Sequence, residues 1–386
     1  MTLSNNLKRL LWVNIFIAGS IELCYVGVVS SMASIFRESL SVMGLTITVY
    51  SLAFAILGPI CMKIFRNINY KIIFIGCLIT ISLGNLFSVF TLNIYLFLFY
   101  RILIGTASSI LISKSISLAS LLSSEKNLDS NLGVLYTAFA GANTFAIPVF
   151  SYFGNRFAWK TIPIMIALTA IIITLIFLLS VPKDYQGIEQ TIIRSKKVSV
   201  SNNIEPIKVL LTSVIILCSN MTFIGYLNPY MEKEGFIQLE ITIALFIFGI
   251  GGILGSYLSP RLTKKHSIKS SLILLLSIYA LILLVIQLNS YKSIFFVLMF
   301  TWSAVQWATG PLLQKHLVTQ TKKDNELFIS LNVASINVGA ALGSLLGGII
   351  ISVIPLTFLP LCAMFIVCIA LLLVASYKEI GLYEEL

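Results

Sequence analysis

Twelve long apolar stretches separated by polar loops run through this sequence of 386 residues. The chain is 58% hydrophobic and only 11% charged, which is typical of a multi-pass membrane protein and excludes an ordinary soluble domain. A helix needs ~20 apolar residues to cross a bilayer. Several stretches are longer, so we expect tilted helices or protruding ends. The predicted spans are 10–36, 43–65, 70–91, 93–122, 129–154, 160–181, 207–230, 238–260, 268–288, 292–314, 325–352 and 355–377.

The first stretch follows Lys8 and Arg9 and therefore imitates a signal peptide. Eleven further spans follow, and no small-residue cleavage pattern is convincing, so we expect it to be retained as the first span.

The basic residues fall unevenly on the two sides of the predicted spans. Of the 26 Lys and Arg residues, 19 lie on the side that holds both termini and five on the other, with Arg101 and Lys114 inside spans. By the positive-inside rule, this bias predicts cytoplasmic termini in a cell inner membrane. The net charge of +11 then reflects an inner face that meets anionic lipid, without a nucleic-acid partner.

The longest polar segment divides the spans into two sets of six. We expect an N-terminal six-helix bundle at 1–181, a cytoplasmic linker at 182–206 and a C-terminal six-helix bundle at 207–386. Small residues recur at helix spacing in 140–142 of one half and 337–348 of the other, where they allow close helix approach in lipid. The predicted fold is all-α, with twelve transmembrane helices in two pseudo-symmetric bundles.

Glu22 is the strongest candidate for a functional group. It is the only charged residue between Leu10 and Phe36, about half way through a ~30 Å bilayer core. A carboxylate there costs roughly 3 kcal/mol on insertion scales. Burial disfavours its charged form and a nearby cationic substrate favours it, so the acid is a candidate for proton coupling. The alternative is a structural acid that holds spans 1 and 4 together.

Two cations in span 4 are candidate partners or cavity residues. Helix geometry places Arg101 and Lys114 roughly 140° apart, with Arg101 in the outer half and Lys114 in the inner half. Lys114 is within roughly 6 Å of Glu22 in depth, so it is a candidate ion-pair partner; the alternative is snorkelling to the inner interface. Tyr25 follows Glu22 by three residues and is expected on the same helix face.

Other substrate-cavity candidates are polar or aromatic residues in spans 5, 7, 10 and 11: Asn143, Tyr226, Asn228, Trp302, Gln306, Asn332 and Asn337. Trp302 and Gln306 are four residues apart on one face, and an aromatic ring with an amide suits a small organic ligand. Tryptophans near span ends are otherwise interface anchors. Pro229 in span 7 is expected to break the helix at an outer gate.

The histidines and motifs exclude several classes of protein. Only His266 and His316 are present, in or near basic inner loops, so no metal cluster is predicted. The sequence has no P-loop and no nucleophile motif, which argues against an ATP-driven pump or a membrane protease. No cofactor and no enzymatic activity are expected.

Several motifs resemble one transporter family. Span 1 carries Glu22-Leu23 followed by Gly27 and Ala33, and span 2 runs from Tyr50 to Gly58-Pro59. The pattern resembles the major facilitator superfamily, and within it the twelve-span drug/proton antiporter branch with its arabinose-efflux-permease-like subgroup.

Other positions match this pattern in part. The loop after span 2 keeps Gly58, Lys63 and Arg66, the residues of a cytoplasmic gate in relatives, but has Met62 where they have Asp. Arg101 with Gly105, Pro148, and Trp159-Lys160 also resemble the family pattern. The departures are Ile147 before that proline and Ser151-Tyr152 in place of paired glycines.

The resemblance implies a monomeric secondary active transporter that exports a small organic molecule by alternating access, coupled to protons through Glu22, with Arg101 bracing span 4. An importer or uniporter is a second interpretation. A membrane sensor or structural protein without transport is a third, which the altered loop motif favours and Glu22 disfavours. Nothing in the sequence selects a substrate.

Overall fold

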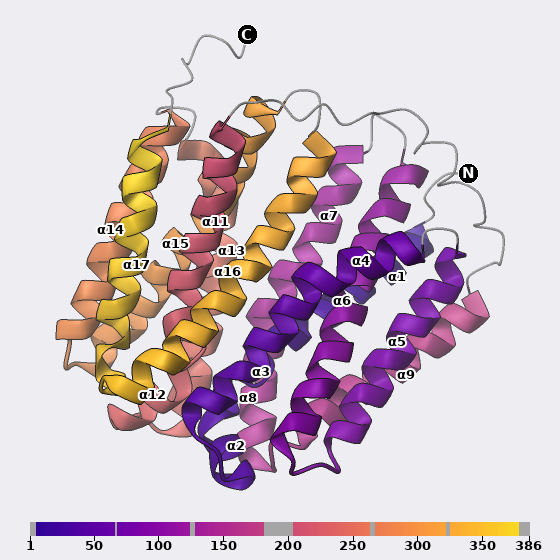
Figure 1. Cartoon of the computed structure of the whole chain (residues 1–386), viewed down its shortest axis with the longest axis horizontal. Coiled ribbons are helices and arrows are strands. Elements are labelled where there is room, and N and C mark those ends of the chain that lie inside the picture. The colour runs from indigo at the N-terminus through magenta and orange to yellow at the C-terminus, as the bar shows by residue number, and fades with distance from the viewer. Residues whose placement is uncertain are drawn as a thin grey trace. The chain divides into compact units, whose positions relative to one another are not determined.

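A computed structural model describes residues 5–65, 68–123, 128–180, 204–262, 267–321 and 325–377, and these residues are helical apart from short turns. The chain forms two compact units (Figure 1). One comprises Met1–Glu38 with Val49–Lys197, and the other comprises Ser39–Thr48 with Val198–Leu386. The first part of the predicted second span therefore belongs to the C-terminal unit. Most of the predicted linker, 182–203, lies outside the described residues.

The N-terminal unit is built from the first six predicted spans. Its helices are α1 (Asn5–Glu22), α2 (Val29–Phe36), α3 (Leu40–Leu52, shared with the other unit), α4 (Gly58–Ile64), α5 (Tyr70–Ser88), α6 (Ile94–Leu122), α7 (Leu128–Gly141), α8 (Ile147–Arg156) and α9 (Thr161–Ser180), with a 3₁₀ turn at Val26–Val28 and π-helical turns at Ala53–Leu57 and Ala142–Ala146.

The C-terminal unit contains the last six predicted spans. Its helices are α11 (Glu205–Ile224), α12 (Leu227–Lys233), α13 (Gln238–Leu262), α14 (Ile268–Leu288), α15 (Lys292–Gln320), α16 (Asn325–Val353) and α17 (Leu359–Ala375), with a 3₁₀ turn at Leu356–Phe358.

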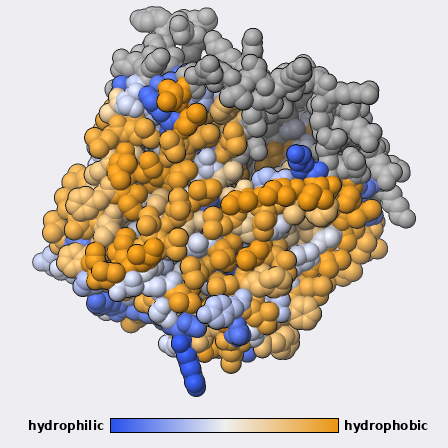
Figure 2. Space-filling view, in the orientation of Figure 1, coloured by the Kyte–Doolittle hydropathy of each residue, from blue (hydrophilic) through white to orange (hydrophobic). Residues whose placement is uncertain are grey.

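Eleven helices in the described residues are long and apolar enough to cross a membrane. The remaining predicted span, 129–154, is the helical stretch from Leu128 to Arg156. The exposed side chains of these helices include many large apolar ones, and apolar residues cover most of the described face in Figure 2. A protein with such a surface requires lipid around it, and the chain is a multi-pass membrane protein.

Two prolines explain the two π-helical turns. Pro59 and Pro148 each lie at the start of a helix that continues directly from a π-helical turn. Proline has no N–H, and its ring clashes with the carbonyl four residues earlier. The wider turn before each proline accommodates that ring without ending the span.

The first span of each unit is interrupted. α1 ends at Glu22 and α2 begins at Val29, while α11 ends at Ile224 and α12 begins at Leu227. Each interrupted span also ends in the same way, with a left-handed residue, Arg37 (φ 57°) in one unit and Gly235 (φ 78°) in the other. The following amides, of Glu38 and Phe236, bond carbonyls five residues earlier, as in a Schellman cap.

The repeat extends to side-chain contacts. Asn69 caps α5 and Ser267 caps α14, each accepting from a backbone N–H of the first turn. Two residues after each cap, Lys71 donates to the carbonyl of Leu178 at the end of α9 (3.1 Å), and Lys269 donates to that of Tyr377 after α17 (2.9 Å). A cation at the C-terminal end of a helix is favoured by the helix dipole. The halves are therefore similar in packing as well as in sequence.

A glycine ladder joins α11 to α16. A Cβ at Gly339, Gly343 or Gly347 would collide with the carbonyl oxygens of Val214, Cys218 and Thr222, respectively. Both sets recur every four residues, so each glycine meets one turn of α11. The small residues predicted at 337–348 do allow the close approach expected from them.

Candidate functional site

Glu22 lies where the first span is interrupted. It is the last residue of α1, and its side chain is half-buried. The carboxylate lies beside the Ser51 hydroxyl of α3 and within electrostatic reach of Arg101 on α6. The predicted acid thus has a hydroxyl and a cation as neighbours, contributed by two other spans of the same unit.

Arg101 binds the backbone carbonyls at the end of α1. Its guanidinium donates to the carbonyl of Ile21 (3.2 Å) and to that of Glu22 (3.1 Å). The last carbonyls of a helix have no partner within the helix, and in lipid an unpaired carbonyl is costly. Arg101, which is fully buried, therefore stabilises the interruption and adds a positive charge where the helix dipole is negative.

Tyr50 of α3 completes this cluster. Its hydroxyl donates to the carbonyl of Ala18 (3.1 Å), and the Arg101 guanidinium lies 4.5 Å from its ring centroid. Gly105 allows α6 to approach, because a Cβ there would collide with the Tyr50 carbonyl. The sequence motif contains Tyr50, yet no role was predicted for it or for Ser51. No signal in the sequence indicated which residues meet Glu22.

Tyr25 lies beyond the end of α1. The expectation of a shared helix face is wrong, because the helix ends at Glu22 and spacing by three residues applies only within a helix. The Tyr25 ring is buried against Phe97 (centroids 5.6 Å apart) and Trp159 (6.4 Å), with the Arg101 guanidinium 5.3 Å from its centroid.

Lys114 is buried on α6, and its ammonium lies 5.0 Å from the ring centroid of Tyr70 on α5. The cation beside the Glu22 carboxylate is Arg101. Arg101 is therefore the partner that we propose for Glu22, and an ion pair between Glu22 and Lys114 stays a prediction. An ammonium over an aromatic face gains cation–π attraction.

In the C-terminal unit, Trp302 is fully buried in an aromatic cluster. Its ring lies 5.0 Å from those of Phe223 and Phe248 and 6.4 Å from that of Tyr279. Gln306, one turn along α15, is also buried, and its amide oxygen has no hydrogen-bond partner among the described residues. The two side chains are near one another, as predicted, but Trp302 is packed among α11, α13 and α14.

Three asparagines predicted for the cavity have different surroundings. Asn332 is buried and links three helices, since it accepts from Ser213 (2.7 Å) and donates to Gln314 (2.9 Å). Asn143 and Asn337 each donate to a carbonyl one turn earlier on their own helix. Asn332 therefore belongs to an interhelical polar network, while the other two amides bond locally.

Tyr226 and Asn228 lie where the span is interrupted between α11 and α12. The Tyr226 hydroxyl donates to the Ser344 carbonyl of α16 (2.8 Å). Asn228 donates to Glu232 (3.2 Å), which also accepts a hydrogen bond from Gln238. Pro229 lies within α12, so the helix interruption precedes it.

The predicted gate is only partly described. Gly58 begins α4 and packs on α6, because a Cβ there would overlap with Ser109. Lys63 is exposed in the last turn of α4. Arg66 lies outside the described residues.

Comparisons with known proteins agree with this architecture. The sequence profile described as Major Facilitator Superfamily matches residues 11–325. The uncharacterized MFS-type transporter YbcL of Bacillus subtilis is 23% identical over 93% of each chain. The inner membrane transport protein YdhP of Escherichia coli K12 is 22% identical over 92% of each. A probable sugar efflux transporter of Mannheimia succiniciproducens is 23% identical over 86% of this chain and 83% of its own.

Solved structures share the fold. The crystal structure of a D-xylose–proton symporter superimposes with a TM-score of 0.78 at 13% identity, covering 96% of this chain and 97% of its own. A bacterial homolog of the human lysosomal transporter Spinster, inward-facing and occupied, gives 0.77 at 13% identity over 95% of each chain. Profile, relatives and fold agree, and the chain is a member of the Major Facilitator Superfamily, a family of membrane transporters.

Proposed function

We propose that this protein is a proton-coupled exporter of a small organic molecule, working by alternating access as a monomer. The observation that carries the proposal is the Glu22 carboxyl at the interruption of the first span, beside Ser51 and Arg101. A carboxylate inside a membrane span is costly when charged. Arg101 opposes this, so movement of the α1 end relative to Arg101 would change the proton affinity of the acid.

The direction of transport rests on the relatives. One of the aligned proteins is called a probable sugar efflux transporter, which supports export and makes sugars the first compounds to test. Import remains the second candidate function, because the D-xylose–proton symporter shares the fold. The Asn332 network and the Gln306 amide are the substrate contacts that we propose in the C-terminal unit, since hydrogen-bonding groups near apolar walls set ligand orientation.

Proteoliposomes with a trapped pH indicator test the coupling. With a proton gradient imposed, sugars and amphipathic cations are added singly, and wild-type protein should dissipate the gradient with at least one of them. Glu22→Gln keeps the shape and most of the hydrogen-bonding capacity of the acid but carries no releasable proton, so it should bind the same compound without proton movement.

The matched control is Glu234→Gln, which removes an exposed acid outside the first span and should behave as wild type. Wild-type proton movement in Glu22→Gln would assign Glu22 a structural role. Gradient-driven uptake from the proton-rich side, with the compound and proton moving together, would favour the importer.

A further inference from the structure

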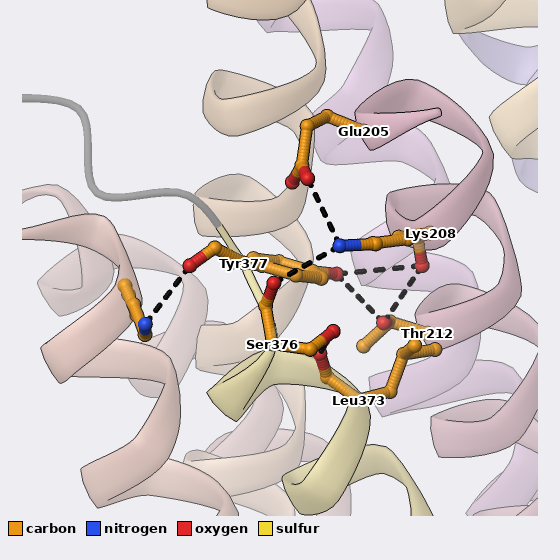
Figure 3. A network of polar contacts seen from close by, with 7 residues as sticks. Glu205, Lys208, Thr212, Leu373, Ser376 and Tyr377 are labelled. Carbon is orange, nitrogen blue, oxygen red and sulfur yellow. Dashed lines mark hydrogen bonds and ion pairs between the residues drawn. The ribbon is translucent and has the colours of Figure 1, made fainter. Parts of the chain in front are cut away.

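The C-terminal end of α17 is held by two lysines from other helices of its unit (Figure 3). α17 ends at Ala375, and Ser376 and Tyr377 follow. Lys208 of α11 donates to the Ser376 carbonyl (3.0 Å), and Lys269 of α14 donates to the Tyr377 carbonyl (2.9 Å). Two backbone carbonyls directly after the last span are thereby paired with cations.

The Tyr377 side chain continues this attachment toward α11. Its ring is buried, and its hydroxyl donates to Thr212 Oγ1 (2.6 Å), which donates to the Lys208 carbonyl (2.9 Å). Lys208 is further tied to Glu205 by an ion pair of 2.9 Å. The first two turns of α11 thus form a polar seat for Tyr377.

His316 of α15 forms the other side of the seat. Its ring stacks on that of Tyr377, with centroids 4.9 Å apart and planes 1° from parallel. His316 lies near the loop, as expected, but within the helix, because it is buried one turn before the end of α15. Both ring nitrogens are buried without a hydrogen-bond partner among the described residues. Leaving a buried polar group unpaired is unfavourable.

Protonation of His316 would increase the energetic cost of burying its ring. A neutral imidazole has one N–H, and an imidazolium has two and a positive charge. An unpaired buried ion costs far more than an unpaired polar group. Glu205 attracts an imidazolium here, but its carboxylate is already shared with Lys208. At the same ends of the helices packed against α15, the charged and titratable groups of the described residues include Glu205 and Lys208 (α11), Arg261 (α13), Lys269 (α14) and Glu326 (α16), with Lys315 on α15 itself and Tyr377 after α17. Among these groups the cations outnumber the acids.

We propose that His316 and Tyr377, with Thr212, Lys208 and Lys269, form an acid-released latch on the C-terminal end of α17. With neutral imidazole the rings stack and the latch is closed. Protonation drives His316 toward water, which unstacks Tyr377 and frees the end of the helix. The latch is a pH-responsive device separate from Glu22, and it does not depend on the proposed export activity.

The sign of the pH dependence follows from the charge. An ordinary histidine titrates near pH 6.5, so the latch is closed at pH 8 and opens as pH falls toward 5.5. When one proton is linked to the opening, the open fraction changes by at most about tenfold per pH unit.

Hydrogen exchange of the full-length protein in lipid nanodiscs tests the latch. The exchange rate of the end of α17, after correction for intrinsic exchange, should rise as pH falls from 8 to 5.5. The end of α9 is the internal reference, because Lys71 binds its Leu178 carbonyl and the two histidines of the chain lie elsewhere in the sequence. Its corrected rate should stay constant.

Three variants distinguish release of the latch from a general destabilisation of the protein at low pH. His316→Phe keeps an aromatic ring against Tyr377 and cannot titrate, so exchange should be slow at every pH. Tyr377→Ala removes the ring and should exchange fast at every pH. If His316→Phe does not fold, His316→Gln replaces it, and its exchange should again be independent of pH. A pH dependence equal to wild type in the His316 variant, a matching rise at α9, or slower exchange in acid would each overturn the proposal.

Discussion

Arg101 stabilises the interruption of the first span. Interrupting a helix inside a membrane leaves carbonyls that lipid cannot satisfy, and Arg101 binds two of them while its guanidinium lies over the rings of Tyr25 and Tyr50. A planar guanidinium can donate in two directions and stack at once, whereas an ammonium cannot do both. The Glu22 site therefore depends on arginine specifically.

Replacing Arg101 with lysine should lower stability. Arg101→Lys loses at least one hydrogen bond to a buried carbonyl and both ring contacts, which we expect to cost roughly 1–3 kcal/mol in the free energy of unfolding. Denaturant unfolding in detergent micelles measures this. Arg261→Lys is the control, because Arg261 is exposed with its guanidinium over Tyr257. Equal losses for the two variants would contradict the role of Arg101 at the end of α1.

Helix pairs in this protein are held together by small residues at defined spacing. The α11–α16 pair is the clearest case, since three glycines face three carbonyls of α11. In lipid there is little hydrophobic drive between helices, so close contact of backbones supplies much of the association. Sequence spacing predicted which residues are small, and the structure identified α11 as the partner helix.

A methyl group in this contact should force the helices apart. Gly343→Ala places a Cβ against the Cys218 carbonyl and should destabilise the unit by about 1–3 kcal/mol. Gly310→Ala is the control on α15, since nothing lies within 4 Å of its added Cβ. Alanine is the better helix former, so this variant should gain up to about 1 kcal/mol. The measurement is the unfolding midpoint of each variant in the same detergent. An unchanged midpoint in Gly343→Ala would show that the glycine contacts do not stabilise the α11–α16 pair.

Across the whole chain, the basic residues set the expected orientation. The 19-to-5 distribution of Lys and Arg predicts that both termini and the segment 182–206 are cytoplasmic. His316, Tyr377 and the two lysines of the latch are then on the cytoplasmic side, where the latch would respond to the pH of the cell interior.

Labelling of intact cells tests this orientation. In a background without the native cysteines, Tyr291→Cys, at an exposed position before α15, should react with a membrane-impermeant maleimide. Ser199→Cys, in the segment 182–206, should react only after permeabilisation. Reaction of Ser199→Cys in intact cells would reverse the orientation.

Hydropathy, proline and glycine spacing and the position of Glu22 could be read from the sequence alone. They predicted an all-helical membrane protein in two repeated halves, the close contact along 337–348 and an acid buried in the first span. These features follow from local composition, because a bilayer requires apolar helices of set length with paired backbones.

The tertiary structure decided which side chains meet. It ended α1 at Glu22, which left Tyr25 outside that helix, brought Arg101 to the last carbonyls of α1, and buried His316 against Tyr377. Sequence spacing assumes an unbroken helix. A helix can stop inside the membrane only where another helix supplies partners for its free carbonyls, and that condition depends on residues eighty positions away in the chain, as Arg101 is from Ile21.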